Sequence, residues 1–519
     1  MSISSALKRS VRSGAVYAPS YIVPQLLTVI TFPVYTRVFS PSDYGLLALI
    51  SITTGFLTIL AVDWVQSSIL RFYAQYCREE RIRDFYRIVL LTSLLTLGVW
   101  MVISLVTVTL LGDRLDPRAR GLVLIGLASF LVDGTIRICL TLLRVLEKAV
   151  TYTAVAIAQA GMRAFFGITL ALVLRNVSGV LWAGIISGLA VLLPLFRAVA
   201  PKDLESSLPV SDSRFNRHHD AIEFISYGLP LLISSLSWYG LDVADRYLVQ
   251  YFRGSYEVGL YSAGYSISSY GFAAIFALLG FSSYPVIVAT YETHGKTAVE
   301  ELLKGLNRYY LMISLPAVLG VSILSKPIVS VLAGEAYHEA YTVIPLVALG
   351  VFFNGLLPFC GKSFVLLKRN KLYAAIALAN ALLNILLNLI LIPYFGYMGA
   401  ALATALSYAS TFLSLWIVGK FVLKFSYNFS AKSILRILVS GLLMSLCLWL
   451  MISRISDGIG ILILEIVTGA VAYILFLFVT REISLRELVL IFGQRRLKSL
   501  AIQDPANLDN PANDGQLEE

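Results

Sequence analysis

The sequence predicts an all-α, polytopic membrane protein, and three observations carry this prediction. Of the 519 residues, 58% are hydrophobic and only 14% are charged, which is outside the range of soluble globular proteins. The apolar residues form fourteen stretches of roughly 18–26 residues, each long enough to cross about 30 Å of hydrocarbon as a helix. Charged residues lie almost entirely in the short connections. Since only helices and closed barrels satisfy every backbone group in lipid, these stretches are expected to be helices.

The fourteen expected spans follow one another from the N-terminal region to residue 480, with short connections between most of them. They are residues 14–36, 44–69, 88–111, 121–143, 150–174, 179–199, 224–245, 258–290, 307–331, 342–366, 373–393, 398–419, 433–452 and 459–480.

The distribution of basic residues predicts the orientation of these spans. Most of the 41 Lys and Arg residues lie at the N-terminus, in every second connection and at the C-terminus. This asymmetry places both termini in the cytoplasm. The net charge of +10 is therefore attributed to topology and to attraction for anionic lipid, and no nucleic-acid partner is expected.

A weak internal repeat predicts two lobes. Tyr17-Ala18-Pro19 resembles Tyr227-Gly228-Leu229-Pro230, and Asp43-Tyr44-Gly45-Leu46 resembles Glu257-Val258-Gly259-Leu260. Both copies run from inside to outside, so the repeats are expected to be parallel, with a cavity between them. The expected units are an N-terminal six-helix lobe (1–200), a cytoplasmic linker (201–222), a C-terminal six-helix lobe (223–420), two further helices (421–480) and a cytoplasmic tail (481–519) with a disordered end.

Ionisable residues inside the spans are the first candidates for function, because a charge at membrane depth costs several kcal/mol. Arg163 lies in the middle of the fifth span, with Gln159 one turn away. It is interpreted either as a contact for an anionic substrate or as half of a structural ion pair. Asp133 and Arg137 are four residues apart in the fourth span, which favours a self-neutralising pair within that helix.

The second span carries a polar stripe of Asp63, Ser67 and Arg71. Asp63 and Asp133 are the candidates for coupling to a proton or a cation, and helix packing is the alternative. Arg71 and Lys362 lie toward the inner ends of their spans. A phosphate contact and snorkelling of the side chain toward the interface both explain Lys362.

Three further predictions concern polar side chains. Asn384 belongs to a stripe with Asn380 and Asn388, which indicates either hydrogen bonds between helices or a sugar-binding face. Tyr265 lies in a span rich in tyrosine and serine, which suits either a surface that touches sugar and lipid or an interfacial belt. Arg37, Asp245 and Arg246 lie at outer span ends and are interpreted as rim contacts between the repeats.

No nucleotide-binding loop, nucleophile elbow, zinc-protease helix or metal-ligand spacing is present. We therefore expect a protein that is not an enzyme and has no cofactor, apart from a proton or sodium ion that could drive transport.

Three groups of residues resemble the signature of bacterial polysaccharide transporters of the oligosaccharide flippase type. The first is Pro33-x-Tyr35-Thr36-Arg37 with Ser40-Pro41-Ser42-Asp43-Tyr44-Gly45-Leu46. The second is Gly228-Leu229-Pro230, Asp245-Arg246-Tyr247 and Val258-Gly259-Leu260-Tyr261-Ser262. The third runs from Asn384-x3-Asn388 through Ile392-Pro393 to Ser407. Together they cover the first twelve spans. The superfamily to which these polysaccharide transporters belong also contains multidrug and toxin extruders and lipid II flippases.

The resemblance implies a fourteen-helix, V-shaped, two-lobed transporter in the bacterial inner membrane. Members of the family move undecaprenyl-diphosphate-linked oligosaccharide from the cytoplasmic to the periplasmic leaflet by alternating access, for O-antigen, capsule or exopolysaccharide. The implied partners are the lipid-linked glycan, membrane lipids, a polysaccharide polymerase and glycosyltransferases. Arg163 and Arg137 are then expected to neutralise the diphosphate, with Lys362 and Arg71 nearer the inner mouth.

Two other classes stay open. A cation-coupled multidrug antiporter of the same fold would favour acidic over basic groups in the cavity. A membrane glycan polymerase ranks last, because the outer connections are short and no Asp-x-Asp motif occurs. For the lipid II branch of the superfamily, the resemblance implies a site with arginines inside helices one, two and eight. Here the internal cations lie on spans four, five and ten, which argues against lipid II as the substrate.

Overall fold

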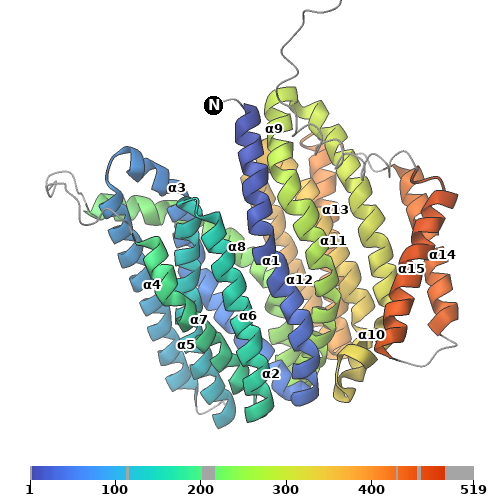
Figure 1. Ribbon diagram of the computed structural model, residues 1–519, viewed down its shortest axis with the longest axis horizontal. Coiled ribbons are helices and arrows are strands. Elements are labelled where there is room, and N and C mark those ends of the chain that lie inside the picture. The colour runs from blue at the N-terminus through green and yellow to red at the C-terminus, as the bar shows by residue number, and fades with distance from the viewer. Residues whose placement is uncertain (1–2, 113–115, 201–216, 428–429, 453–457, 485–519) are drawn as a thin grey trace, which may run out of the picture.

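The computed structural model describes residues 3–112, 116–200, 217–427, 430–452 and 458–484, and these residues contain helices and no strand (Figure 1). The helices are α1 (Ile3–Val38), α2 (Pro41–Thr58), η1 (Ile59–Asp63), α3 (Trp64–Arg78), α4 (Ile82–Leu111), α5 (Pro117–Val145), α6 (Ala149–Leu174), α7 (Ser178–Val199), α8 (Arg217–Arg253), α9 (Ser255–Ile323), α10 (Ser325–Leu332), η3 (Glu335–Thr342), α11 (Ile344–Leu366), α12 (Asn370–Phe395), α13 (Tyr397–Phe421), α14 (Ala431–Ile452) and α15 (Ile459–Val479).

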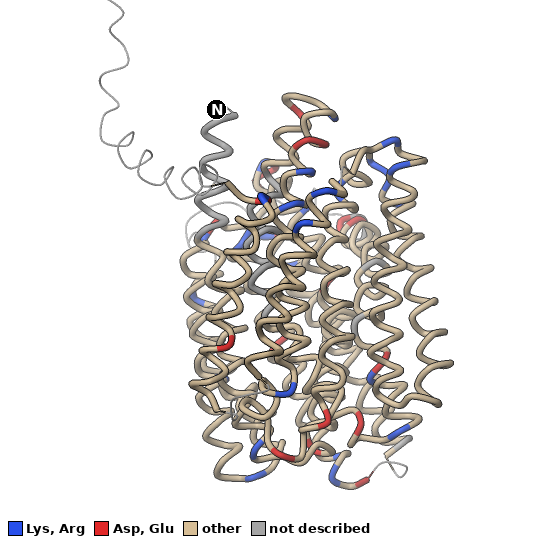
Figure 2. The backbone as a smooth tube through the Cα atoms, turned by 90° about the vertical axis from the view of Figure 1, so that its right-hand side faces the viewer, with Lys and Arg blue, Asp and Glu red and all other residues tan. Residues whose placement is uncertain are grey.

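The predicted all-α, multi-pass fold is confirmed, but the count of fourteen spans is not. Twelve helices among the described residues are long and apolar enough to cross a membrane. The expected spans at 14–36 and 258–290 fall on α1 and on the first part of α9, which are helical but are not among the twelve. In Figure 2 the charged residues gather toward the two ends of the bundle and few lie between them, as a membrane-spanning protein requires.

Three expected spans are not regular single helices. The second consists of α2, a π-helical turn (η1) and α3, joined without a break. π-Helical turns are rare and occur frequently at functional sites. The eighth and ninth expected spans are joined in α9, whose helical geometry is interrupted at Gly295 (φ 76°). Glycine adopts a positive φ without a steric penalty, so the two helical parts of α9 are joined at Gly295 without a loop.

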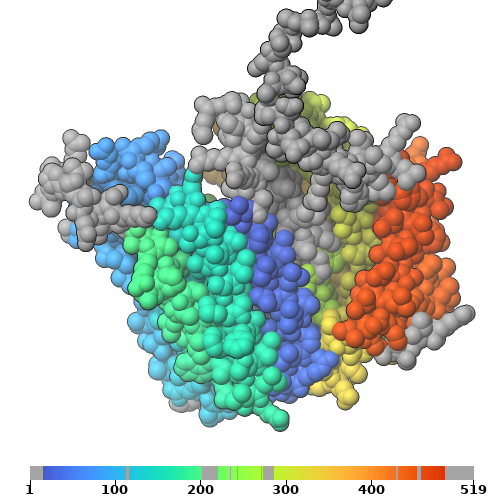
Figure 3. Space-filling model, viewed as in Figure 1, coloured from blue at the N-terminus to red at the C-terminus, as the bar shows by residue number. Residues whose placement is uncertain are grey.

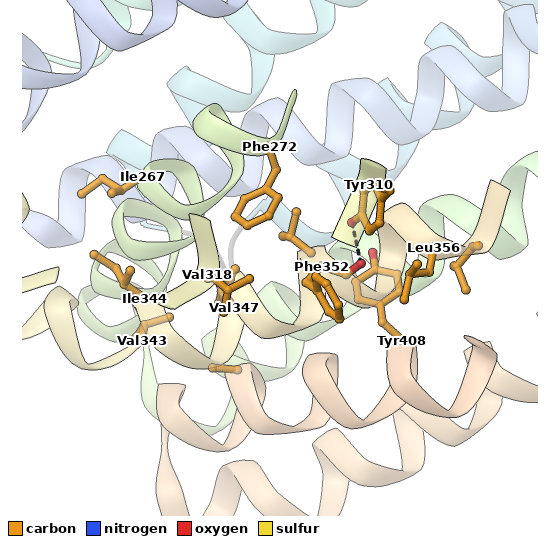
Figure 4. Close-up of a cluster of buried hydrophobic side chains, with 14 of the residues drawn as sticks. Ile267, Phe272, Tyr310, Val318, Val343, Ile344, Val347, Phe352, Leu356 and Tyr408 are labelled. Atoms are coloured by element: carbon orange, nitrogen blue, oxygen red, sulfur yellow. Dashed lines mark hydrogen bonds between the residues drawn. The ribbon is translucent and has the colours of Figure 1, made fainter. Parts of the chain in front are cut away.

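The core consists of two large clusters of buried apolar side chains. One lies among α2 to α7 and includes Val65 and Phe130. The other lies among α9 to α15 and includes Tyr310, whose hydroxyl donates to the Phe352 carbonyl at 2.7 Å (Figure 4). Helix α8 contributes Phe224, near its start, to the first cluster and later residues to the second. The predicted unit boundaries at 200 and 223 stay a prediction.

The internal repeat is supported by a reciprocal contact between α2 and α9. A Cβ atom added at Gly45 would lie 2.1 Å from the carbonyl oxygen of Ser255. A Cβ atom added at Gly259 would lie 1.9 Å from the carbonyl oxygen of Pro41. Gly45 and Gly259 are equivalent positions of the two sequence repeats, as are Pro41 and Ser255. Such reciprocity is the property of a twofold contact, and it agrees with parallel repeats related by an axis between them.

A second contact between the two repeats lies nearby, at the end of the bundle away from residue 3. Arg37, at the end of α1, donates from Nη2 to the Val331 carbonyl at 2.8 Å and from Nη1 to the Leu332 carbonyl at 3.4 Å. These are among the last carbonyl groups of α10, which have no partner within their own helix. The guanidinium therefore caps a helix of the other repeat, as expected for a contact that joins the two.

Candidate functional site: a charge cluster at mid-helix depth

Four charged residues lie at mid-depth on the N-terminal helices, and we call them the charge cluster: Asp63, Asp133, Arg137 and Arg163. Asp63 is the last residue of the π-helical turn η1, and the others lie near the middle of α5 or α6. Ionisable groups at this depth are costly unless they face water, one another or a ligand.

Arg163 faces other helices of the N-terminal half. Its Nη2 lies 3.4 Å from Oδ2 of Asp133 on α5, and Tyr35 of α1 lies within electrostatic reach of the same guanidinium. Figure 3 shows α1, in blue, lying against α6, in teal. Charge-assisted hydrogen bonds are usually 2.7–2.9 Å long, so this pair is loose. The Arg163 side chain is 48% exposed, which leaves the guanidinium accessible.

The predicted intrahelical pair of Asp133 and Arg137 is wrong. Asp133 pairs with Arg163 across the helix interface, and no carboxylate of the described residues lies within ion-pair distance of Arg137. The spacing along α5 permits the intrahelical pair, but helix packing brings α6 closer to Asp133. Arg137 is exposed and lies within electrostatic reach of Asp63.

Asp63 lies where helices of the N-terminal half meet α8 of the C-terminal half. Besides Arg137, the hydroxyl group of Ser235 on α8 lies beside its carboxylate. The neighbouring Gln66 donates from Nε2 to the Arg137 carbonyl at 3.1 Å and to Oγ1 of Thr141 at 2.8 Å, which fixes the register of α3 on α5. The π-helical turn thus places a carboxylate at the junction of α3, α5 and α8.

The remaining candidates of the N-terminal half make no side-chain hydrogen bond or ion pair with another of the described residues. Gln159 is partly buried one turn before Arg163, and Arg71 is exposed two turns from Asp63 toward the end of α3. Their part in a substrate site stays a prediction.

The candidates of the C-terminal half are more enclosed than those of the N-terminal half. Lys362 of α11 is 8% exposed, and its Nζ lies 5.7 Å from the centre of the Phe359 ring. The ring of Tyr265 lies 4.3 Å from the Arg246 guanidinium, so this tyrosine is already engaged in a cation–π contact.

Asn384 does not line a surface open to a sugar, which corrects the sharper of the two interpretations. The residue is fully buried, and its Nδ2 donates to Oγ of Ser407 on α13 at 3.1 Å. Asn388 donates to Oδ1 of Asn384 at 3.0 Å. Asn384 therefore links α12 to α13, as expected if the stripe serves hydrogen bonds between helices, whereas Asn388 bonds within α12.

The three predicted rim residues serve two different contacts. Arg37 joins α1 to α10, as described above. Asp245 and Arg246 are buried within the C-terminal half, where the Asp245 carboxylate accepts hydrogen bonds from Tyr261 of α9 and from Thr404 of α13.

Several residues of functional interest were missed by the sequence analysis. Ser235 of α8 meets the charge cluster, and no one-dimensional pattern marks it. Gly184 of α7 also meets it, but its spacing from Gly188 indicates helix packing only. Glu465 is different, because a carboxylate within the apolar run of α15 is visible in the sequence; it is 2% exposed. No group of three or more metal-ligating side chains occurs in the part of the chain that the structure describes.

Comparison with known proteins identifies the family. A sequence profile described as "Polysaccharide biosynthesis protein" matches residues 10–291, which is more than half of the 519 residues. The chain belongs to this family. A second profile, MatE, matches residues 230–390. The family resemblance predicted from the sequence motifs is thereby confirmed.

Individual relatives agree with this assignment. The chain is 25% identical over 212 residues to the probable low-salt glycan biosynthesis flippase Agl15 of Haloferax volcanii, and this match covers 40% of the chain. It spans 44% of the length of that curated relative. The structure is similar to that of the lipid II flippase MurJ in an inward closed conformation, with a TM-score of 0.71, 17% identity and coverage of 90% of this chain and 99% of that one.

A multidrug resistance MATE family transporter in an inward-facing conformation is also similar, with a TM-score of 0.63, 14% identity and coverage of 77% of this chain and 94% of that one. At these identities the two structural matches show a shared fold.

Proposed function

We propose that this protein is a flippase that moves an undecaprenyl-diphosphate-linked oligosaccharide from the cytoplasmic to the periplasmic leaflet by alternating access. The observation that carries the proposal is the pair of accessible guanidinium groups, Arg163 and Arg137, at mid-helix depth. Family membership supports it, as does the similarity to a probable glycan biosynthesis flippase and to the structure of a lipid II flippase.

The chemistry of the cargo explains why arginine is needed at this depth. A diphosphate is anionic and strongly hydrated, so it does not cross the apolar layer unaided. Guanidinium binds phosphate oxygens through two parallel hydrogen bonds and keeps its charge when partly desolvated. The loose contact between Arg163 and Asp133 leaves donors of the guanidinium available to a phosphate, and a closer ligand could displace the carboxylate.

Charge balance supports ion coupling as part of this proposal. The charge cluster contains two carboxylates and two guanidinium groups, so its formal charge is zero. A bound diphosphate would leave an uncompensated negative charge at membrane depth. Uptake of protons or sodium ions at Asp63 and Asp133 would restore the balance, and these residues remain our candidates for coupling.

The cellular setting belongs to the same proposal. We place the protein in the bacterial inner membrane with both termini in the cytoplasm, on the strength of its basic-residue asymmetry. A polysaccharide polymerase and glycosyltransferases are its expected partners, and the protein itself is expected to carry out no chemical reaction.

A cation-coupled multidrug antiporter is the second candidate, and the MatE profile match supports it. The composition of the charge cluster argues against it, because an antiporter of this kind is expected to have acidic groups in excess of basic ones, and the charge cluster has equal numbers of the two. A deletion strain separates the two functions. Loss of surface polysaccharide with unchanged drug tolerance is expected, and the reverse result would favour the antiporter.

The test of the substrate site is charge removal at Arg163. In a deletion strain that produces Arg163→Ala at the wild-type protein level, we expect loss of surface polysaccharide, with partial activity retained by Arg163→Lys. Arg197→Ala is the matched control, since Arg197 is an exposed arginine in the last turn of α7, away from the charge cluster. Full surface polysaccharide in Arg163→Ala would refute the assignment of this residue.

A further inference from the structure

The guanidinium of Arg163 occupies space that a missing side chain leaves open. A Cβ atom added at Gly184 of α7 would lie 2.8 Å from Nη2 of Arg163 and 3.4 Å from its Cζ and Nε atoms. A separation of 2.8 Å is shorter than any normal contact of a Cβ atom. The guanidinium can therefore lie where it does only because residue 184 is glycine.

A second glycine near Arg163 accommodates another polar group in the same way. A Cβ atom added at Gly167, one turn after Arg163 on α6, would lie 2.2 Å from the hydroxyl oxygen of Tyr35. Asp133 approaches the guanidinium from α5. The Arg163 guanidinium therefore has Gly184 on one side and Asp133 on another, and the hydroxyl group of Tyr35 lies over Gly167 nearby.

Helix packing is the ordinary explanation for Gly184, because Gly184 and Gly188 form a small-xxx-small motif. The structure shows that the two glycines have different neighbours. A Cβ atom added at Gly188 would lie 2.3 Å from Cγ1 of Val132 and 3.2 Å from Cδ1 of Ile136, which are apolar atoms of the neighbouring helix α5. At Gly184 the three nearest atoms all belong to the guanidinium of Arg163. Gly188 is thus a packing residue, whereas Gly184 contacts the candidate anion site.

We propose that Gly184 is a positioning residue that holds the Arg163 guanidinium where it meets the diphosphate of the cargo. This inference rests on the proposed function. Binding groups in a transport or catalytic site must be held close to their productive geometry, and a displacement of about 1 Å can cost on the order of 100-fold in rate. A methyl group at position 184 displaces the end of a flexible side chain and no backbone atom. It should therefore perturb the site far more than the fold.

The experiment compares Gly184→Ala with Gly161→Ala in the full-length protein. Gly161 lies two residues before Arg163 on α6, and a Cβ atom there would meet nothing within 4 Å. The rate at which surface polysaccharide reappears after induction in a deletion strain is measured, together with the melting temperature of the purified protein. Gly184→Ala should lower the rate roughly 10-fold or more at an unchanged melting temperature. Gly161→Ala should change neither.

A double-mutant cycle distinguishes positioning from packing. Lysine has no Nη2 atom, so Gly184→Ala should lower the rate little further when it is added to Arg163→Lys. An equal loss in both backgrounds would overturn the inference, and so would a melting temperature well below that of Gly161→Ala. A normal rate in Gly184→Ala, with Arg163→Ala inactive, would refute the positioning role alone. A normal rate in Arg163→Ala would refute the assignment of Arg163 to the substrate site, on which the positioning role rests.

Discussion

The reciprocal crossing of α2 and α9 makes a sharp prediction about Gly259. A Cβ atom there would lie 1.9 Å from the Pro41 carbonyl oxygen, and close carbon–oxygen contacts in proteins are about 3.3–3.6 Å. The two helices would have to separate by more than about 1 Å. Both clashing groups are held by helix backbone, so no rotation of a side chain relieves the contact. We expect Gly259→Ala to destabilise the protein by about 1–3 kcal/mol or more, the range for overpacked cores.

The assay is thermal unfolding of the purified protein in detergent, with Gly305→Ala as the control. Gly305 also lies in α9, beyond the interruption at Gly295, and a Cβ atom there would meet nothing within 4 Å. The control should be neutral or slightly more stable, because alanine is favoured over glycine in a helix by roughly 0.5–1 kcal/mol. If Gly259→Ala were as stable as Gly305→Ala, the helices would not cross as described, and the structural support for the repeat would be lost.

Three further predictions follow from contacts outside the charge cluster. Arg37→Ala should lower stability by about 1–2 kcal/mol, because the last carbonyl groups of α10 lose their donor; unfolding temperatures equal to wild type would contradict the contact. Asn384→Ala should destabilise the pairing of α12 with α13 by about 1–3 kcal/mol, without a selective loss of transport per folded molecule. A large transport defect in a stable Asn384→Ala protein would restore the sugar-contact interpretation. Glu482→Gln should destabilise by about 2 kcal/mol or more, because the nearly buried carboxylate pairs with Arg308 at 2.7 Å, and trypsin sensitivity of the C-terminal region should rise.

Helix positions were largely predictable from hydropathy. The expected spans at 150–174 and 179–199 match α6 (Ala149–Leu174) and α7 (Ser178–Val199) within a residue. Hydropathy fails where the chain departs from one straight helix per crossing. It does not show the π-helical turn that ends at Asp63, nor the direct joining of two helical parts of α9 at Gly295, because both depend on local backbone geometry.

The residues of the candidate site were partly predictable. Charge at membrane depth identified all four members of the charge cluster, because the cost of burying charge is visible in the sequence. Their pairing was not predictable, because the partner of Asp133 is chosen by the packing of α6 against α5 and not by spacing along α5. For the same reason the contact of Gly184 with Arg163 was not predictable, because the spacing of Gly184 and Gly188 indicates helix packing and the guanidinium comes from another helix.

The sidedness of the lipid-linked glycan tests the central claim most directly. Spheroplasts of a strain that makes only the double variant Arg137→Ala and Arg163→Ala would be probed with a membrane-impermeant lectin that binds the oligosaccharide. The account predicts that the diphosphate-linked oligosaccharide accumulates in the cytoplasmic leaflet and stays inaccessible to the lectin until the membrane is opened. A lectin-accessible fraction equal to that of wild type, with the variant present at normal levels, would contradict it.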